Sequence, residues 1–179
     1  MGDPPLDEVG EQQAATLASD LAPLRPVWVA SSDLERARAT ASVVAARCGT
    51  HVKVDPSLRE VDLGGWEGLT HSEVRSRLPE EYRRWRDGED IRRGGGETCA
   101  EAACRFSAAL QRLASTLAPG ATGVVVAHGV VLQHALDALA SAGLLLEPNL
   151  SAGAPHLANG AWMALDLAAL PAERLSRDG

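Results

Sequence analysis

A histidine at a strand–helix junction is the first residue that could carry chemistry. His128 follows the continuous apolar run 123–127 and precedes Gly129, after which the pattern becomes helical. An imidazole there faces the mouth of a sheet, beside helix amides that favour anions, and Gly129 lets a ligand approach the backbone. A buried, hydrogen-bonded or capping histidine is the alternative interpretation, and this motif alone does not separate the two.

Arg36 is the second candidate. It follows the run 31–35 (Ser-Ser-Asp-Leu-Glu), so it falls in the first turn of a helix that comes after a strand. The helix dipole disfavours a cation at that place, but an anion held between the arginine and the amides would explain it, and the guanidinium fork suits a phosphate. The alternative is a surface arginine paired with Glu35 or Asp33.

Glu60 is the third candidate, at the start of a glycine-containing segment that spans residues 58–69. A carboxylic acid beside a phosphate site can protonate a leaving alkoxide. The alternative is a salt bridge between Glu60 and its neighbour Arg59 within the loop.

Local patterns predict the elements that would position these residues. Capping boxes at Thr70–Glu73 and Thr98–Glu101 mark two helix starts, and Pro79 should end the first of these helices. The segments around 80–96 and 145–158 are expected to be loops that select the substrate, with 87–96 a charged, Gly-rich, mobile surface loop. The full set comprises helices at 8–22, 34–47, 70–78, 98–117 and 130–142 and strands at 27–30, 52–54, 123–127 and 161–167.

Strands that alternate with helices predict a three-layer α/β/α sandwich around a largely parallel sheet, in one domain over residues 1–179 with a tail at 168–179. Ligands of such folds bind at the carboxyl ends of strands. Arg36, Glu60 and His128 all follow predicted strands, so we expect them to meet there. The chain opens on a helix, which in a strand–helix alternation leads us to expect that a first strand is missing.

The composition argues against several kinds of partner. The 179 residues carry a formal net charge of −7, so a phosphate backbone would be repelled and we expect no nucleic-acid partner. No apolar run approaches the about 20 residues of a membrane span, and the N-terminus lacks the pattern of a signal peptide. Three sparse cysteines and an arginine-dominated basic set suggest a bacterial protein of the reducing cytoplasm. His128 and His134 do not share a helix face, so we expect no metal.

Taken together, the motifs resemble the histidine phosphatase family, which includes the cofactor-dependent phosphoglycerate mutases. The resemblance spans residues 2–167, and its motifs fall in the family's order. The matching segments are Asp3-Pro4-Pro5-Leu6 with Gly10 and Gln13, Ser31-Ser32-Asp33-Leu34 with Arg36-Ala37 and Thr40-Ala41, Leu58-Arg59-Glu60 with Gly64 and Trp66-Glu67-Gly68, Gly95-Gly96-Glu97-Thr98, Ala127-His128-Gly129 with Val131, and Asn159.

The resemblance implies roles for the three candidates. Arg36 would clamp a phosphoryl group with Gly129 nearby, His128 would hydrogen-bond its oxygens and stabilise the transition state, and Glu60 would protonate the departing oxygen. The resemblance implies a site without a metal, and we expect no cofactor for this chain. The implied partner is phosphate or a small phosphorylated substrate. In the family, another histidine attacks phosphorus and forms a phosphohistidine, which water then hydrolyses.

That attacking histidine belongs to an Arg-His-Gly motif on the family's first strand, upstream of the segment matched here. Three explanations stay open: a truncated chain or wrongly assigned start, a catalytically silent relative, or attack by His128 itself. The expected function is phosphomonoester hydrolysis of a small metabolite. The alternatives are a phosphate-ligand-binding or interaction module and a mutase-type phosphotransferase, the latter less consistent with the short chain. Whether the protein forms a homo-oligomer stays open.

Overall fold

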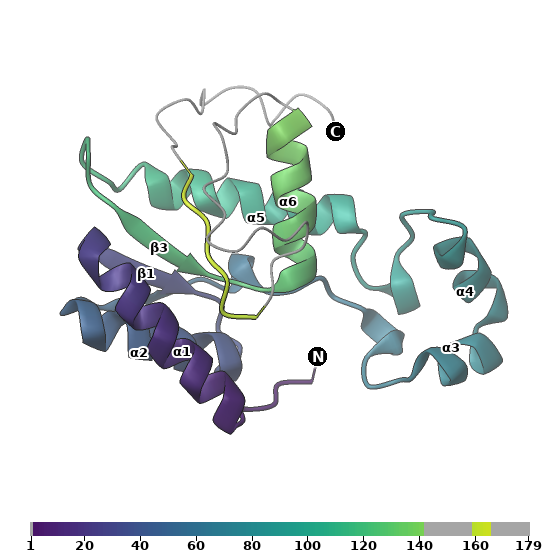
Figure 1. Cartoon of the computed structure of the whole chain (residues 1–179). Coiled ribbons are helices and arrows are strands. Elements are labelled where there is room, and N and C mark those ends of the chain that lie inside the picture. Colours follow the sequence, from purple (N-terminus) through teal and green to yellow (C-terminus); the bar gives the residue numbers. More distant parts are fainter. Residues whose placement is uncertain (1, 142–158, 166–179) are drawn as a thin grey trace.

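A computed structural model describes residues 2–141 and 159–165 of the chain (Figure 1). Helices and strands alternate through most of its length. The elements are α1 (Glu8–Leu21), β1 (Trp28–Ser31), α2 (Glu35–Cys48), β2 (Val52–Val54), α3 (His71–Arg77), α4 (Pro79–Arg86), α5 (Cys99–Ala114), β3 (Gly123–Val126) and α6 (Gly129–Ser141).

In the described part of the chain the strands form one parallel sheet in the order β2–β1–β3. Val29 in the central strand pairs with Val52 on one side and Val124 on the other. All four residues of β1 are buried, whereas those of β3 are half-buried. The predicted parallel sheet is therefore confirmed, with β1 as its covered centre.

The sheet lies between two helical layers, as Figure 1 shows. Trp28 and Ala30 of β1 pack into one core cluster with α5 and α6, and Val29 packs into the other with α1 and α2. This division follows from the strand geometry, because successive side chains point to opposite faces. The three-layer sandwich predicted from the sequence is thus confirmed.

Most predicted helix ends are also confirmed. Asp7 caps α1 by accepting a 2.8 Å hydrogen bond from the backbone of Gly10. Both capping boxes form, at Thr70 before α3 and at Thr98 before α5. Gly49 ends α2 with φ of 68°, a left-handed conformation that glycine adopts without strain.

The prediction of loop structure after Pro79 was wrong for its first part. Pro79 begins α4 instead of leading into a loop, because proline lacks only a backbone donor that is unsatisfied at the first helical position anyway. Acidic residues in the first turn of α4 and arginines in its last turn complement the helix dipole.

The segment 87–96, predicted to be a mobile loop, is held by contacts at Asp90 and Gly94. Asp90 accepts hydrogen bonds from the first amides of α5, at 2.7 Å from Cys99 and 2.9 Å from Ala100. Gly94 packs so closely on the turn at 64–66 that a Cβ there would lie 2.6 Å from the backbone nitrogen of Trp66. The charged, glycine-rich sequence of 87–96 therefore belongs to a tightly packed turn.

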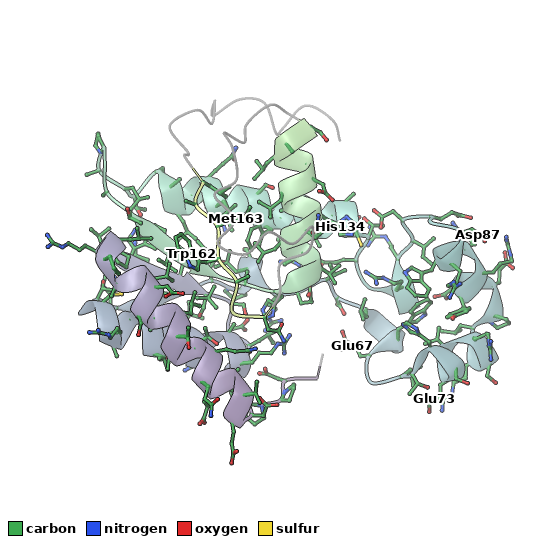
Figure 2. The ribbon with its side chains drawn as sticks, viewed as in Figure 1. Glu67, Glu73, Asp87, His134, Trp162 and Met163 are labelled. Atoms are coloured by element: carbon green, nitrogen blue, oxygen red, sulfur yellow. The ribbon has the colours of Figure 1, made fainter. Side chains whose placement is uncertain are left out.

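The last strand predicted, at 161–167, does not form over the described residues 161–165. Trp162, labelled in Figure 2, nevertheless packs against the core cluster of α1 and α2. Alternating hydrophobicity therefore does not guarantee a paired backbone, because strand formation depends on the tertiary context. Residues 166 and 167, the predicted loop at 145–158 and the predicted tail at 168–179 lie outside the described residues.

Residues 62–96, which include α3 and α4, form a lobe beside the sandwich (Figure 1). Its centre is aromatic: the ring centroid of Trp66 lies 5.7 Å from that of Trp85, and Tyr82 lies 5.6 Å from Trp85. Glu81 joins the parts of the lobe, since its carboxylate accepts from the Trp66 indole at 3.1 Å and from the Gly94 amide at 3.0 Å.

Candidate phosphate site

The candidate site lies at the carboxyl ends of β1 and β3. Ser31 at the end of β1 pairs with Val126 at the end of β3, so the loops that follow leave the same edge of the sheet. One loop leads into α2 and carries Ser32, and the other leads into α6 and carries His128. Two helix N-termini therefore converge where an α/β sheet binds ligands.

His128 is buried at this edge, with both ring nitrogens in contact with the segment that follows β1. Its Nε2 lies 2.8 Å from the hydroxyl oxygen of Ser32, and its Nδ1 lies 3.2 Å from Nη2 of Arg36. A guanidinium can only donate, so Nδ1 is the unprotonated acceptor. The neutral ring therefore carries its hydrogen on Nε2 and donates it to Ser32.

The environment of His128 favours that neutral ring. Burial, followed by repulsion from the Arg36 guanidinium, lowers the pKa of His128 from 6.5 to about 4. Burial removes water that would stabilise the imidazolium, and the neighbouring cation opposes a second positive charge. The interpretation of His128 as a buried, hydrogen-bonded residue is thus compatible with its position in the site.

Arg36 faces the site from the first turn of α2 and is paired there with an acidic residue that was not a candidate. Asp3 lies 3.7 Å from the guanidinium of Arg36. Both carboxylate oxygens of Asp3 also accept from the backbone nitrogen of Glu35, at 2.7 and 2.9 Å. Neither Glu35 nor Asp33 pairs with Arg36, because Asp33 pairs with Arg59. A negative charge therefore does lie between Arg36 and the helix amides, and the chain itself supplies it.

Glu60 comes to the site from a separate segment. Its carboxylate accepts from the backbone nitrogens of Val131 at 2.8 Å, Val130 at 3.0 Å and Val61 at 2.9 Å. Two of these amides belong to the first turn of α6, which begins directly after His128. Glu60 is thus the cap of the helix that carries the site histidine.

The salt bridge between Arg59 and Glu60, considered as the alternative role for Glu60, does not form. Arg59 instead donates to Asp33 at 2.7 Å, and its guanidinium lowers the pKa of that carboxyl. This contact joins the segment before Glu60 to the loop before α2. It therefore links two segments that border the candidate site.

Gly129 opens α6 and is exposed. A Cβ on Gly129 would meet no atom within 4 Å, so packing does not require glycine here. The open space is consistent with the predicted approach of a ligand to the backbone at this position.

The structure therefore brings Arg36 into contact with His128 and places Glu60 and Gly129 at the start of the same helix. Reasoning from the sequence missed Ser32 and Asp3 as parts of the site. Both lie in segments that matched the family motifs, and this was the one feature of the sequence that could have identified them as site residues. Ser32 contacts His128, 96 positions further along the chain, and Asp3 contacts Glu35, 32 positions further along. No local sequence pattern encodes contacts over such separations.

The other polar clusters have ordinary structural roles. Arginines of the lobe pair with nearby acids: Arg83 with Glu80 and Asp87, and Arg84 with Glu89. Figure 2 shows Asp87 at the outer end of this lobe. Across residues 2–141 and 159–165, no group of three or more His, Cys, Asp and Glu could hold a metal ion. Within those ranges no helix is both long and apolar enough to cross a bilayer.

Several known proteins that are similar to this chain are named as phosphatases. Residues 1–167 match the family model of the histidine phosphatase superfamily, branch 1. The glucosyl-3-phosphoglycerate phosphatase of Mycolicibacterium vanbaalenii is 36% identical over 143 residues, which cover 76% of this chain and 64% of that protein. The metal-independent phosphoserine phosphatase of Arabidopsis thaliana is 35% identical over 165 residues, covering 88% of this chain and 68% of that protein.

Solved structures agree with these matches. The mycobacterial glucosyl-3-phosphoglycerate phosphatase in complex with inorganic phosphate superposes with a TM-score of 0.69 at 35% identity, over 76% of this chain and 70% of that one. A Bacillus stearothermophilus protein, YhfR, gives the same TM-score at 31% identity, over 78% of this chain and 69% of that one. The chain matches 64% and 66% of the length of the first curated relatives, just under two thirds.

Proposed function

The chain belongs to the histidine phosphatase superfamily, and from that premise we propose that it is a phosphomonoester hydrolase acting on a small phosphorylated metabolite. The observation that carries the proposal is the contact of Arg36 with His128 at the converging starts of α2 and α6. A guanidinium, an imidazole and helix amides are the groups that bind a phosphoryl dianion.

In this proposal Arg36 clamps the phosphoryl group and Gly129 leaves room for it beside the backbone of α6. A dianion beside Arg36 would offset the positive charge that disfavours protonation of His128. The Nδ1 position could then take up a proton and donate it in a hydrogen bond to a phosphoryl oxygen. Such a donor stabilises charge that develops in the transition state.

Glu60 is proposed as the acid that protonates the leaving oxygen. Its carboxylate caps the helix that begins with Gly129, so it lies beside the proposed phosphoryl position. A proton donor must be within hydrogen-bond reach of the departing oxygen, and the three amides that hold Glu60 limit the positions its side chain can take.

A second candidate function is a phosphate-ligand-binding or interaction module without turnover. The printed sequence contains no Arg-His-Gly, the family motif that supplies the attacking histidine. His128 is a poor substitute, since its Nδ1 accepts from Arg36 and its Nε2 donates to Ser32. Neither nitrogen has a lone pair free to attack phosphorus in this arrangement.

The proposed substrate class comes from the named relatives, which act on glucosyl-3-phosphoglycerate and phosphoserine. Both are small phosphorylated metabolites, and a mutase-type transfer is the alternative reaction on such a molecule. We also propose a cytoplasmic location in a bacterium, on the grounds of composition and cysteine usage. Nucleic acid is not a proposed partner, and self-association is left to measurement.

Hydrolysis of p-nitrophenyl phosphate in the presence of a metal chelator tests the proposal, with vanadate as inhibitor. Vanadate-sensitive turnover would support a phosphatase. Saturable binding of vanadate without turnover would support the binding module. Turnover that is lost in His128→Ala but retained in His134→Ala would require His128 to take part directly. Absence of both turnover and anion binding would reject the site.

A further inference from the structure

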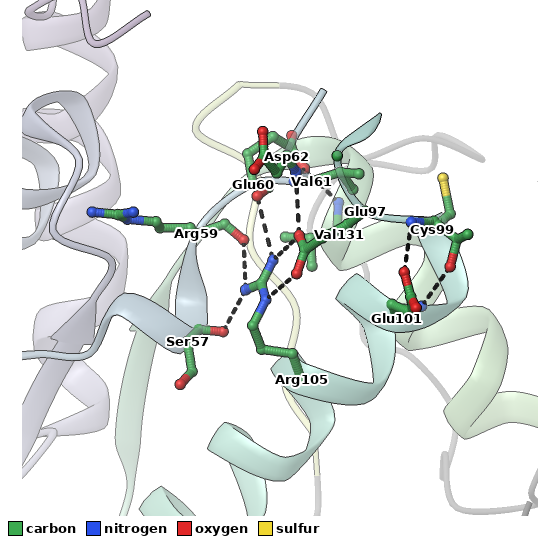
Figure 3. Close-up of polar contacts among 12 residues, drawn as sticks. Ser57, Arg59, Glu60, Val61, Asp62, Glu97, Cys99, Glu101, Arg105 and Val131 are labelled. Carbon is green, nitrogen blue, oxygen red and sulfur yellow. Dashed lines mark hydrogen bonds and ion pairs between the residues drawn. The ribbon is translucent and has the colours of Figure 1, made fainter. Parts of the chain in front are cut away.

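Arg105 on α5 is a half-buried arginine whose five N–H donors all have acceptors, as Figure 3 shows. Its Nη1 donates to the backbone oxygens of Ser57 at 2.8 Å and Arg59 at 3.2 Å. Its Nη2 donates to the backbone oxygen of Glu60 at 3.4 Å and to Glu97 at 2.7 Å, and its Nε donates to Glu97 at 2.9 Å. No donor is left for a ligand, so Arg105 does not bind phosphate in this arrangement.

Glu97 completes this contact from the other side. Its carboxylate accepts from the backbone nitrogen of Asp62 at 3.2 Å, and its own backbone nitrogen donates to the oxygen of Asp62 at 2.9 Å. The Arg105 guanidinium is the largest cause that lowers the pKa of Glu97, so the carboxylate stays charged. The segment 57–62 is therefore held at both ends by one ion pair.

Glu60 lies inside that held segment, and its side chain reaches away from it to α6. The backbone amides of Val130 and Val131 belong to the first turn of α6 and have no acceptor within their own helix. Glu60 is their acceptor. The position of the Glu60 carboxylate can thus be followed through two individual amide protons.

We propose that Arg105, with Glu97, is the positioning residue for Glu60, and that it sets where the proposed acid stands relative to α6. The inference rests on the proposed function for the role of Glu60. Lysine could keep the charge and the pairing with Glu97, but one ammonium lacks the fixed fork that serves three carbonyls and a carboxylate together. Positioning should therefore be lost in Arg105→Lys although the charge is kept.

Hydrogen exchange of single amides tests the geometry without any turnover. In Arg105→Lys the amides of Val130 and Val131 should exchange on the order of tenfold faster, because a misplaced Glu60 no longer protects them. The Leu132 amide, which donates to the His128 carbonyl, is the internal reference. The control is Arg112→Lys on the same helix, whose arginine donates to the side chains of Asp55 and Ser57, and it should leave all three amides unchanged.

A double-mutant cycle of Arg105→Lys and Glu60→Gln, measured by turnover, tests the role of Arg105 in catalysis. Arg105→Lys should lower kcat about tenfold for a poor leaving group, with little change in vanadate affinity, and should add little to the loss already caused by Glu60→Gln. Independent, additive losses would overturn the proposal, as would unchanged exchange at Val130 and Val131. If Arg105→Lys does not fold, Glu97→Gln serves as the second variant with the same expectations. If the protein without substitutions shows no turnover, that result counts against the proposed function alone. The hydrogen-exchange result would still decide whether Arg105 positions Glu60.

Discussion

Nη2 of Arg36 lies 3.2 Å from Nδ1 of His128, although the two residues are 92 positions apart. The contact makes the guanidinium the donor and the imidazole the acceptor, which assigns the ring hydrogen to Nε2. It also places a fixed cation beside a neutral imidazole, at the edge of a sheet where two helix N-termini meet. A bound dianion would favour protonation of His128 and would accept hydrogen bonds from Arg36.

Replacing Arg36 should weaken anion binding directly. Arg36→Ala removes charge-assisted hydrogen bonds, so the affinity for vanadate or phosphate should fall by about tenfold to a hundredfold. Isothermal titration calorimetry measures the change. Arg38→Ala is the matched control, because Arg38 is an exposed arginine on the same helix. Equal affinities in the Arg36→Ala and unaltered proteins would show that Arg36 is not the clamp.

His128 should make the protein less stable in mild acid. Its pKa is lowered to about 4 in the folded chain from 6.5, so between these values the unfolded chain binds more protons. The free energy of unfolding should therefore fall as the pH drops from about 6.5 to about 4, by about 2 to 3 kcal/mol from this residue. Urea unfolding across this range should give a shallower dependence for His128→Asn. Parallel curves for the two proteins would contradict the assignment.

Anion binding should be coupled to proton uptake at the same residue. A dianion beside Arg36 favours the charged imidazole and raises the pKa of His128 in the complex. Sulfate, which stays a dianion over this range, should thus bind more tightly as the pH falls from neutral toward about 5. Calorimetry in buffers of different ionisation enthalpy counts the protons taken up. A His128→Asn protein that retains the full pH dependence would rule out His128 as the group that titrates.

The acid role of Glu60 predicts a dependence on the leaving group. Glu60→Gln removes the transferable proton, so turnover should fall most for alkyl phosphates and least for p-nitrophenyl phosphate, whose leaving group needs little protonation. Rates for a series of phosphomonoesters test this. A uniform loss across the series would reject proton donation. Asp62→Asn is a suitable control, since Asp62 lies two positions away and is exposed.

Close backbone packing near the site predicts a large effect of one methyl group. A Cβ on Gly96 would clash with the carbonyl oxygen of Asp62 and lie 2.8 Å from the backbone nitrogen of Gly64. These backbone atoms cannot rotate aside, so Gly96→Ala should lower the free energy of unfolding by about 3 kcal/mol. Gly65→Ala is the control, because its Cβ would find the nearest backbone atom at 3.5 Å, and its effect should stay near zero. Thermal or urea unfolding measures the stability of both variants. Equal stabilities of Gly96→Ala and Gly65→Ala would contradict the close backbone packing at Gly96.

Much of the fold could be predicted because its signals are local. The capping boxes at Thr70 and Thr98, the left-handed Gly49 and the apolar run at 123–127 each depend on a few neighbouring residues. Predictions failed where one local signal has two outcomes. Proline can end a helix or begin one, as it does in α4. Alternating hydrophobicity does not guarantee a paired strand, as at 161–165, where no strand forms and the residues are half-buried or exposed.

The sequence by itself determined the α/β sandwich, its family and three candidate residues for a phosphate site, because periodicity, caps and ordered motifs are properties of the chain. Only the tertiary structure decided how those residues are used. It paired Arg36 with Asp3 and His128, made Glu60 the cap of α6 and turned Arg105 toward the backbone of the Glu60 segment. The strand register and the packing of α5 create these contacts, and neither is encoded within a short stretch of sequence.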